Sequence, residues 1–309
     1  MPPSSRRDPA LVLPEIKLDK IAPPYLNYLY FEGCGAYPFR PQATMFDMVN
    51  AWWLIEASTL VYAEEPFVTK NFQKAGFGHV EFFSGDSTQC FVANHDDFAI
   101  VAFRGTEIRK REGRSDVQNI IPDLKADADV VLIDSGQGGK VHRGFKNGLD
   151  EVWEKEDLLN YITGLDKSNH RIWFTGHSLG AALATLAADR YGHVQGLYTF
   201  GSPRVGDIDF KNDFHISAYR FVNNNDIVTR VPPSGIYHHV GDLKYIDSKG
   251  DIHDNASRWE RLTDGIRGES LYLFNALGQL RTGFANLIPD DIVDHVPTLY
   301  ATHIWNNIP

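Results

Sequence analysis

The chain has 309 residues, of which 43% are hydrophobic and 23% charged, values typical of a folded globular protein rather than a disordered or collagen-like one. Its 40 acidic and 30 basic residues give a formal net charge of −10, which disfavours nucleic acid as a partner. The two cysteines, Cys34 and Cys90, are too few for a disulfide scaffold. No stretch approaches the roughly 20 apolar residues that span a bilayer, and the N-terminus lacks a secretory signal. We therefore expect a soluble protein, cytoplasmic or exported by a non-standard route.

The first part of the chain changes character near residue 44. Residues 1–44 are rich in proline and aromatic residues and predict an irregular arm, because proline disfavours both helix and central strand. Residues 45–309 are expected to form a single domain. A long helix opens it, since apolar residues recur there at spacings of three and four: Met45, Met48, Ala51, Trp52, Ile55 and Leu60.

Strand and helix patterns then alternate along the chain. Short β-rich runs at 79–84, 88–94 and 98–103, separated by turn-forming residues, predict antiparallel strands. After a helical stretch at 145–162, runs at 171–175, 196–200 and 218–222 alternate with an Ala-rich helix and a linking segment. The order strand, helix, strand indicates a parallel α/β sheet.

The central motif is Gly176-His177-Ser178-Leu179-Gly180, a G-x-S-x-G pattern. A buried strand enters it and the Ala-rich helix leaves it, which is the arrangement of a nucleophile elbow. The glycines leave room for the sharp turn, and the serine hydroxyl projects at the helix N-terminus. A glycine-rich turn that carries a serine by chance is the alternative, and the context favours Ser178 as a nucleophile.

Such a serine needs a histidine to take its proton and a carboxylate to orient that histidine, and the chain order at an elbow is serine, acid, histidine. Asp226 lies just past the strand at 218–222, where side chains reach the carboxyl edge of the sheet. A simple turn-forming role, after three asparagines, is its alternative. Asp207 and Asp209 are interpreted as cap or turn residues.

The histidines after Asp226 are His238, His239, His253, His295 and His303. His295 is interpreted as the base, because it precedes a helical segment and can hang from a loop over the sheet edge. His303, further along that segment, is the second candidate, whereas His238 and His239 stand at a strand start and are interpreted as structural. The sequence has no HExxH motif and no Cys/His cluster, so we expect neither a catalytic metal nor a cofactor.

The sequence resembles the class 3 (fungal-type) lipase family over about residues 45–305, in six ordered blocks: VAFRGT, VHRGFKNGLDEVW, FTGHSLGAALATLAA, YTFGSPRVGDIDF, YRFVNNNDIVTRVPP and DIVDHVPTLY. The resemblance implies an α/β-hydrolase fold, with a mostly parallel central sheet flanked by helices and a lid after the oxyanion loop. It also implies ester hydrolysis, and the family's catalytic positions fall on Ser178, Asp226 and His295. A helical insertion at about 255–290, carrying a Leu/Phe stripe, is expected before the histidine.

The resemblance further implies an oxyanion hole formed by the backbone amides of Thr106 and Leu179, with a lid over 117–124. The apolar face of that lid is formed by Val117, Ile120, Ile121 and Leu124. The charged segment 107–116 and Pro122 depart from the family's pattern. A solvated charged loop beside an ordinary core helix is therefore the other interpretation of this region.

The sequence thus predicts a serine carboxylic-ester hydrolase that cleaves acyl esters, acylglycerols among them, through an acyl-enzyme, with a lipid–water interface as one place of action. One alternative is an esterase for polar substrates, of the aryl or feruloyl type, which the charged segment favours. The other is a non-catalytic lipid-binding protein of the same fold, which would need none of the catalytic residues. Acyl chain length and oligomeric state are not legible in the sequence.

Overall fold

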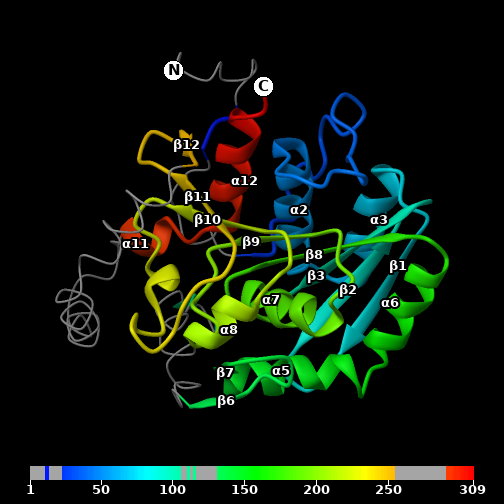
Figure 1. Cartoon of the computed structure of the whole chain (residues 1–309). Coiled ribbons are helices and arrows are strands. Elements are labelled where there is room, and N and C mark those ends of the chain that lie inside the picture. The colour runs from blue at the N-terminus through cyan, green and yellow to red at the C-terminus, as the bar shows by residue number, and fades with distance from the viewer. Residues whose placement is uncertain (1–10, 14–22, 106–109, 112–113, 116–130, 255–289) are drawn as a thin grey trace.

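The computed structural model describes residues 11–13, 23–105, 110–111, 114–115, 131–254 and 290–309. A central sheet carries helices on both of its faces (Figure 1). Within the described part of the chain, no helix is both long and apolar enough to cross a membrane. The predicted lid and nearly all of the predicted insertion at 255–290 lie outside the described residues.

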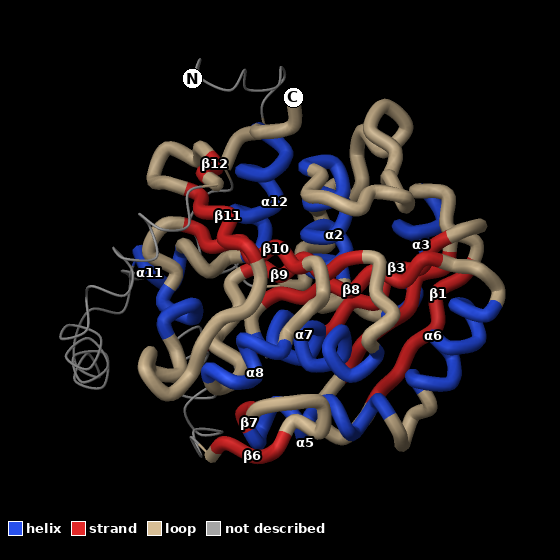
Figure 2. Tube along the Cα trace, viewed as in Figure 1, coloured by secondary structure: helices blue, strands red, loops and turns tan. Residues whose placement is uncertain are grey.

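The sheet has eight strands in the spatial order β1-β2-β3-β8-β9-β10-β11-β12. The five neighbours from β3 to β11 are parallel, whereas β1, β2 and β12 pair antiparallel. The strands β1 and β12 lie at the two edges of the sheet (Figure 2). All residues of β3 and β9 are buried, as expected for strands covered on both faces. This mixed, mostly parallel sheet confirms the predicted α/β class. Its strands are β1 (His79–Ser84), β2 (Gln89–Asn94), β3 (Phe98–Phe103), β8 (Arg171–His177), β9 (Gly196–Phe200), β10 (Ala218–Asn223), β11 (Asp242–Ile246) and β12 (Ile252–His253).

Two short strand pairs lie outside the main sheet: β4 (Lys110–Arg111) with β5 (Arg114–Ser115), and β6 (Leu132–Asp134) with β7 (Lys140–His142).

The helices form two layers, each with its own hydrophobic core (Figure 1). One layer holds α2 (Met48–Leu60), α3 (Glu65–Lys74) and α12 (Pro297–Asn306). The other holds α5 (Arg143–Trp153), α6 (Leu158–Lys167), α7 (Leu179–Tyr191) and α8 (Ile208–Asp213). A short helix, α11 (Asp290–Val293), and the 3₁₀ turn η2 (Ile227–Arg230) complete the described elements.

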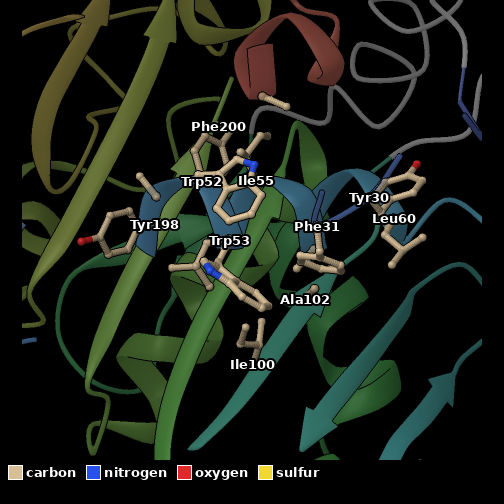
Figure 3. Close-up of a cluster of buried hydrophobic side chains, with 14 of the residues drawn as sticks. Tyr30, Phe31, Trp52, Trp53, Ile55, Leu60, Ile100, Ala102, Tyr198 and Phe200 are labelled. Carbon is tan, nitrogen blue, oxygen red and sulfur yellow. The ribbon is translucent and has the colours of Figure 1, made fainter. Parts of the chain in front are cut away.

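The opening helix differs from the predicted one in its start and in its burial. It begins at Met48 after an Asp47 cap whose side chain accepts from the Asn50 amide, and Met45, outside the helix, is 74% exposed. Every residue from Val49 to Leu60 is buried, so the predicted one-sided stripe is wrong. The reason is visible in Figure 3, where α2 lies in the middle of the core and its two tryptophans point to different neighbours. The sheet covers one side of the helix, while α12 and the N-terminal segment cover the rest.

Residues 23–44 pack against α2. Tyr30 and Phe31 are buried in the same core, and the rings of Phe31 and Trp53 are 4.9 Å apart. Glu56, fully buried in α2, accepts hydrogen bonds from the Tyr28 hydroxyl at 2.6 Å and from the Phe31 amide at 3.0 Å. The division into an arm and a domain stays a prediction.

The helical stretch expected at 145–162 consists of two helices, α5 and α6. Asp157 immediately precedes α6 with a φ of 67°, a left-handed conformation that cannot continue a helix. Both Cys34 and Cys90 are free thiols.

Candidate active site

Ser178 stands alone between a strand and a helix. β8 ends at His177, α7 begins at Leu179, and Ser178 has φ 59° and ψ −130°, a strained conformation for a residue with a side chain. A Cβ atom on Gly176 would overlap the carbonyl of Gly180, and one on Gly180 would overlap the carbonyl of Phe103. The predicted strand–turn–helix arrangement is therefore confirmed, together with the steric need for both glycines.

Asp226 follows β10 and is fully buried. Its Oδ1 accepts from the Val228 amide at 2.9 Å, as expected of the residue that caps η2, so the turn-forming interpretation holds too. The same carboxylate reaches His295, whose Nδ1 lies 2.9 Å from Oδ2 and 3.0 Å from Oδ1. Asp226 thus caps a turn and binds a histidine at the same time.

His295 lies in the loop between α11 and α12, and its ring is 4.4 Å, centroid to centroid, from that of His177. A carboxylate accepts, so Nδ1 donates to Asp226, and in the neutral ring Nε2 carries the lone pair. Nε2 of His295 and Oγ of Ser178 are both buried, and neither has a hydrogen-bond partner among the described residues. The structure therefore brings the three predicted residues to the carboxyl edge of the sheet and leaves the two reactive atoms unengaged.

The rival candidates lie elsewhere. Asp207 caps α8 by accepting from the Phe210 amide, as expected for a cap residue. His303 lies in α12 against Gly250, and His239 Nε2 donates to the Thr229 carbonyl at 2.8 Å. Asp226 caps the η2 turn, and His239 reaches that turn only through its hydrogen bond to Thr229.

Tyr300, one turn into α12, is a residue that sequence reasoning missed. Its hydroxyl donates to Asp226 Oδ2 at 2.5 Å and accepts from the Asn223 amide at 3.0 Å. Burial, and then the negative charge of Asp226, raise the pKa of Tyr300 well above its usual value, so the hydroxyl keeps its proton. Nothing in the local sequence marks this tyrosine, although it lies within the DIVDHVPTLY block.

The structure describes one of the two residues predicted to form the oxyanion hole. Leu179 is the first residue of α7, where the positive end of the helix dipole favours negative charge. Thr106 lies outside the described residues, but Gly105 before it closely approaches the nucleophile, since a Cβ there would be 3.2 Å from Ser178 Cβ. The lid residues Val117, Ile120, Ile121 and Leu124 also lie outside the described residues.

Residues 100–235 match the class 3 lipase family. The chain is therefore similar to class 3 lipases over this part of its length. Its relatives include a lipase of Rhizomucor miehei, 36% identical over 43% of this chain and 40% of that protein, and a lipase of Caenorhabditis elegans, 34% identical over 69% of this chain and 62% of that protein. The chain thus spans about half the length of these two relatives.

The fold agrees with that similarity. A fungal lipase–inhibitor complex, presented as a model for interfacial activation in lipases, superposes with a TM-score of 0.54 over 81% of this chain and 96% of that one, at 21% identity. The chain therefore has the α/β-hydrolase fold that the resemblance implied.

Proposed function

We propose that this protein is a serine carboxylic-ester hydrolase that cleaves acyl esters, acylglycerols among them. The single observation that carries the proposal is the pairing of His295 Nδ1 with the buried Asp226 carboxylate, while His295 Nε2 and Ser178 Oγ stay buried and unpartnered among the described residues. The match of residues 100–235 to the class 3 lipase family supports the same chemistry.

In the proposed reaction, Ser178 Oγ attacks the ester carbonyl carbon while His295 Nε2 accepts its proton. Asp226 holds the imidazole in the required tautomer and stabilises the imidazolium. The oxyanion is bound by the Leu179 amide and, as the family resemblance implies, by that of Thr106. The tetrahedral species collapses, His295 gives its proton to the leaving alcohol, and an ester forms on Ser178. Water, activated by His295, then releases the acid and restores the serine.

The substrate proposal rests on the relatives, which are named lipases, and on the apolar face that the sequence predicts for Val117, Ile120, Ile121 and Leu124. We propose that this face covers the acyl chain. Seven of the ten residues 107–116 are charged, which makes deep insertion into hydrocarbon costly and favours short to medium acyl chains. The same charges also favour the alternative of an esterase for polar substrates, of the aryl or feruloyl type.

Ser178→Ala tests the reaction. Hydrolysis should fall by about six orders of magnitude with the fold unchanged, because triad members act as a unit. Turnover near the wild-type rate, in a preparation free of other esterases, would remove the assignment and favour a lipid-binding protein.

A rate series tests the substrate class. Nitrophenyl esters from short to long acyl chains, measured beside an emulsified triglyceride and a feruloyl ester, should show the highest kcat/KM for short to medium acyl chains. A feruloyl optimum would favour the polar-ester alternative. Deleting part of segment 107–116 should shift the preference toward longer chains, and an unchanged profile would contradict the lid proposal.

A further inference from the structure

A second histidine packs directly on the proposed base. His177, the residue before Ser178, is 3% exposed, and its Nε2 lies 2.7 Å from the main-chain carbonyl oxygen of His295. A carbonyl oxygen can only accept a hydrogen bond, so His177 Nε2 must carry a proton. This bond joins the strand that delivers the nucleophile to the loop that delivers the base.

The other nitrogen of His177 faces a tyrosine. Tyr62, just beyond the end of α2, has its hydroxyl 3.2 Å from His177 Nδ1. Burial, and then the nearby His295, lower the pKa of His177 well below its usual value, so the ring is neutral and Nδ1 accepts the Tyr62 proton. Burial also raises the pKa of Tyr62, which keeps that proton in place. The backbone of Gly105, two residues after the end of β3, hydrogen-bonds to the same hydroxyl.

We propose that Tyr62 and His177 form a positioning pair for the catalytic histidine. Tyr62 holds His177 in the tautomer with a proton on Nε2, and this proton holds the His295 main chain so that the His295 side chain faces Ser178. The inference rests on the proposed function and deepens it. Neither residue hydrogen-bonds to Ser178 Oγ or His295 Nε2, so both act by positioning His295.

A neutral His177 also suits the charge that develops in the reaction. His295 becomes an imidazolium in the proposed mechanism, and a second cation only 4.4 Å away would oppose that step. The titratable and charged groups that face His177, directly or through one neighbour, are Tyr62 with Arg104 over its ring, His295 with Asp226, and Tyr300. The side chain of His177 itself has a hydrogen-bonding group at each nitrogen and needs no further partner.

Three substitutions of His177 distinguish the effect of its Nε2 hydrogen-bond donor from that of its aromatic ring. His177→Gln places an amide N–H near the position of Nε2, His177→Asn places one near Nδ1, and His177→Phe keeps a stacked ring without a donor. We expect the Gln variant to keep kcat on a soluble nitrophenyl ester within about fivefold of wild type. The Asn and Phe variants should lose about 30- to 100-fold in kcat with little change in KM, because small misplacements of catalytic groups are that costly.

Tyr62→Phe should cost about two- to tenfold in kcat, the effect of one neutral hydrogen bond. Thermal unfolding of each variant shows whether it is folded at the assay temperature. A merely structural role would lower the unfolding temperature without this ranking of kcat. Wild-type kcat in the Phe variant, or an equal loss in the Gln and Phe variants, would overturn the proposal.

A second measurement needs no substrate. In ¹⁵N-histidine-labelled protein, the resonance that disappears in His177→Phe should show a proton on Nε2 that exchanges slowly with water. A proton on Nδ1 instead would overturn the pairing with His295. Failure of the proposed function is seen separately, as a wild-type turnover no higher than that of Ser178→Ala. In that case the tautomer measurement still decides whether Tyr62 and His177 position His295.

Discussion

At the scale of single residues, the Asp226 carboxylate accepts three donors: the Val228 amide, the His295 imidazole and the Tyr300 hydroxyl. Tyr300→Phe removes one of them and leaves two. We expect kcat to fall by about tenfold and the free energy of unfolding by about 1.5–3 kcal/mol, the contribution of a hydrogen bond to a charged group. Steady-state kinetics and urea unfolding measure the two effects.

Tyr161→Phe is the matched control for this change. The Tyr161 hydroxyl accepts a hydrogen bond from the Asn94 side chain at 2.6 Å, between α6 and β2. Wild-type kcat in Tyr300→Phe would show that Asp226 does not depend on this donor.

His295 and His303 make a second comparison, since one candidate base lies next to Asp226 and the other lies against Gly250. His295→Ala should be nearly as damaging as loss of the serine, whereas His303→Ala should keep most of the activity. Wild-type activity should fall toward acid pH, because the imidazole must be neutral to accept the serine proton. The opposite ranking of the two variants in kcat/KM would move the base to His303.

At the scale of elements, the contact between α7 and β3 depends on a missing side chain. Gly180→Ala would force a Cβ into the Phe103 carbonyl, so we expect α7 to shift and both stability and activity to fall. Gly164, in α6, is the matched control, because a Cβ there meets nothing within 4 Å. Gly164→Ala should be stabilising by about 0.5–1 kcal/mol, since alanine is the better helix former. Equal unfolding midpoints for the two variants would contradict the proposed clash.

The contact between α2 and the N-terminal segment depends on a buried acid. Burial raises the pKa of Glu56 from 4.5 to about 7, against the hydrogen bonds from Tyr28, Phe31 and Trp52 that lower it. The folded state therefore binds this proton more tightly than the unfolded state. The stabilisation is complete below pH 4.5 and is lost as the pH rises to about 7. The difference between the two pKa values corresponds to a loss on the order of 3 kcal/mol in the free energy of unfolding.

Glu56→Gln should remove this pH dependence, because a neutral amide can bond both Tyr28 and Phe31 at any pH. Chemical unfolding of both proteins between pH 4.5 and pH 8 measures it, with Glu65→Gln on the exposed surface of α3 as the control. A wild-type stability that does not decrease over this range relative to Glu56→Gln would contradict a buried carboxyl with a raised pKa.

At the scale of the whole molecule, the sequence predicts the contiguous elbow and the order of the catalytic candidates. It does not predict the supporting hydrogen bonds between distant segments. The elbow at Ser178 is legible because strand, glycines and helix are contiguous, and Asp226 and His295 follow from chain order. Tyr300 and the Tyr62–His177 pair are not legible, because their hydrogen bonds join residues 74, 115 and 118 positions apart. The all-round burial of α2 is hidden for the same reason, since its cover comes from distant segments.

The assembly of the candidate site from distant segments also has a kinetic consequence. His295 meets Asp226 across 69 residues and His177 across 118, and both contacts form only when the C-terminal helix docks on α2. Loops of this length close slowly compared with the formation of helices. During refolding from denaturant, the helical signal in circular dichroism should therefore return before esterase activity does. We therefore expect an intermediate that has its secondary structure but cannot yet carry out the proposed reaction.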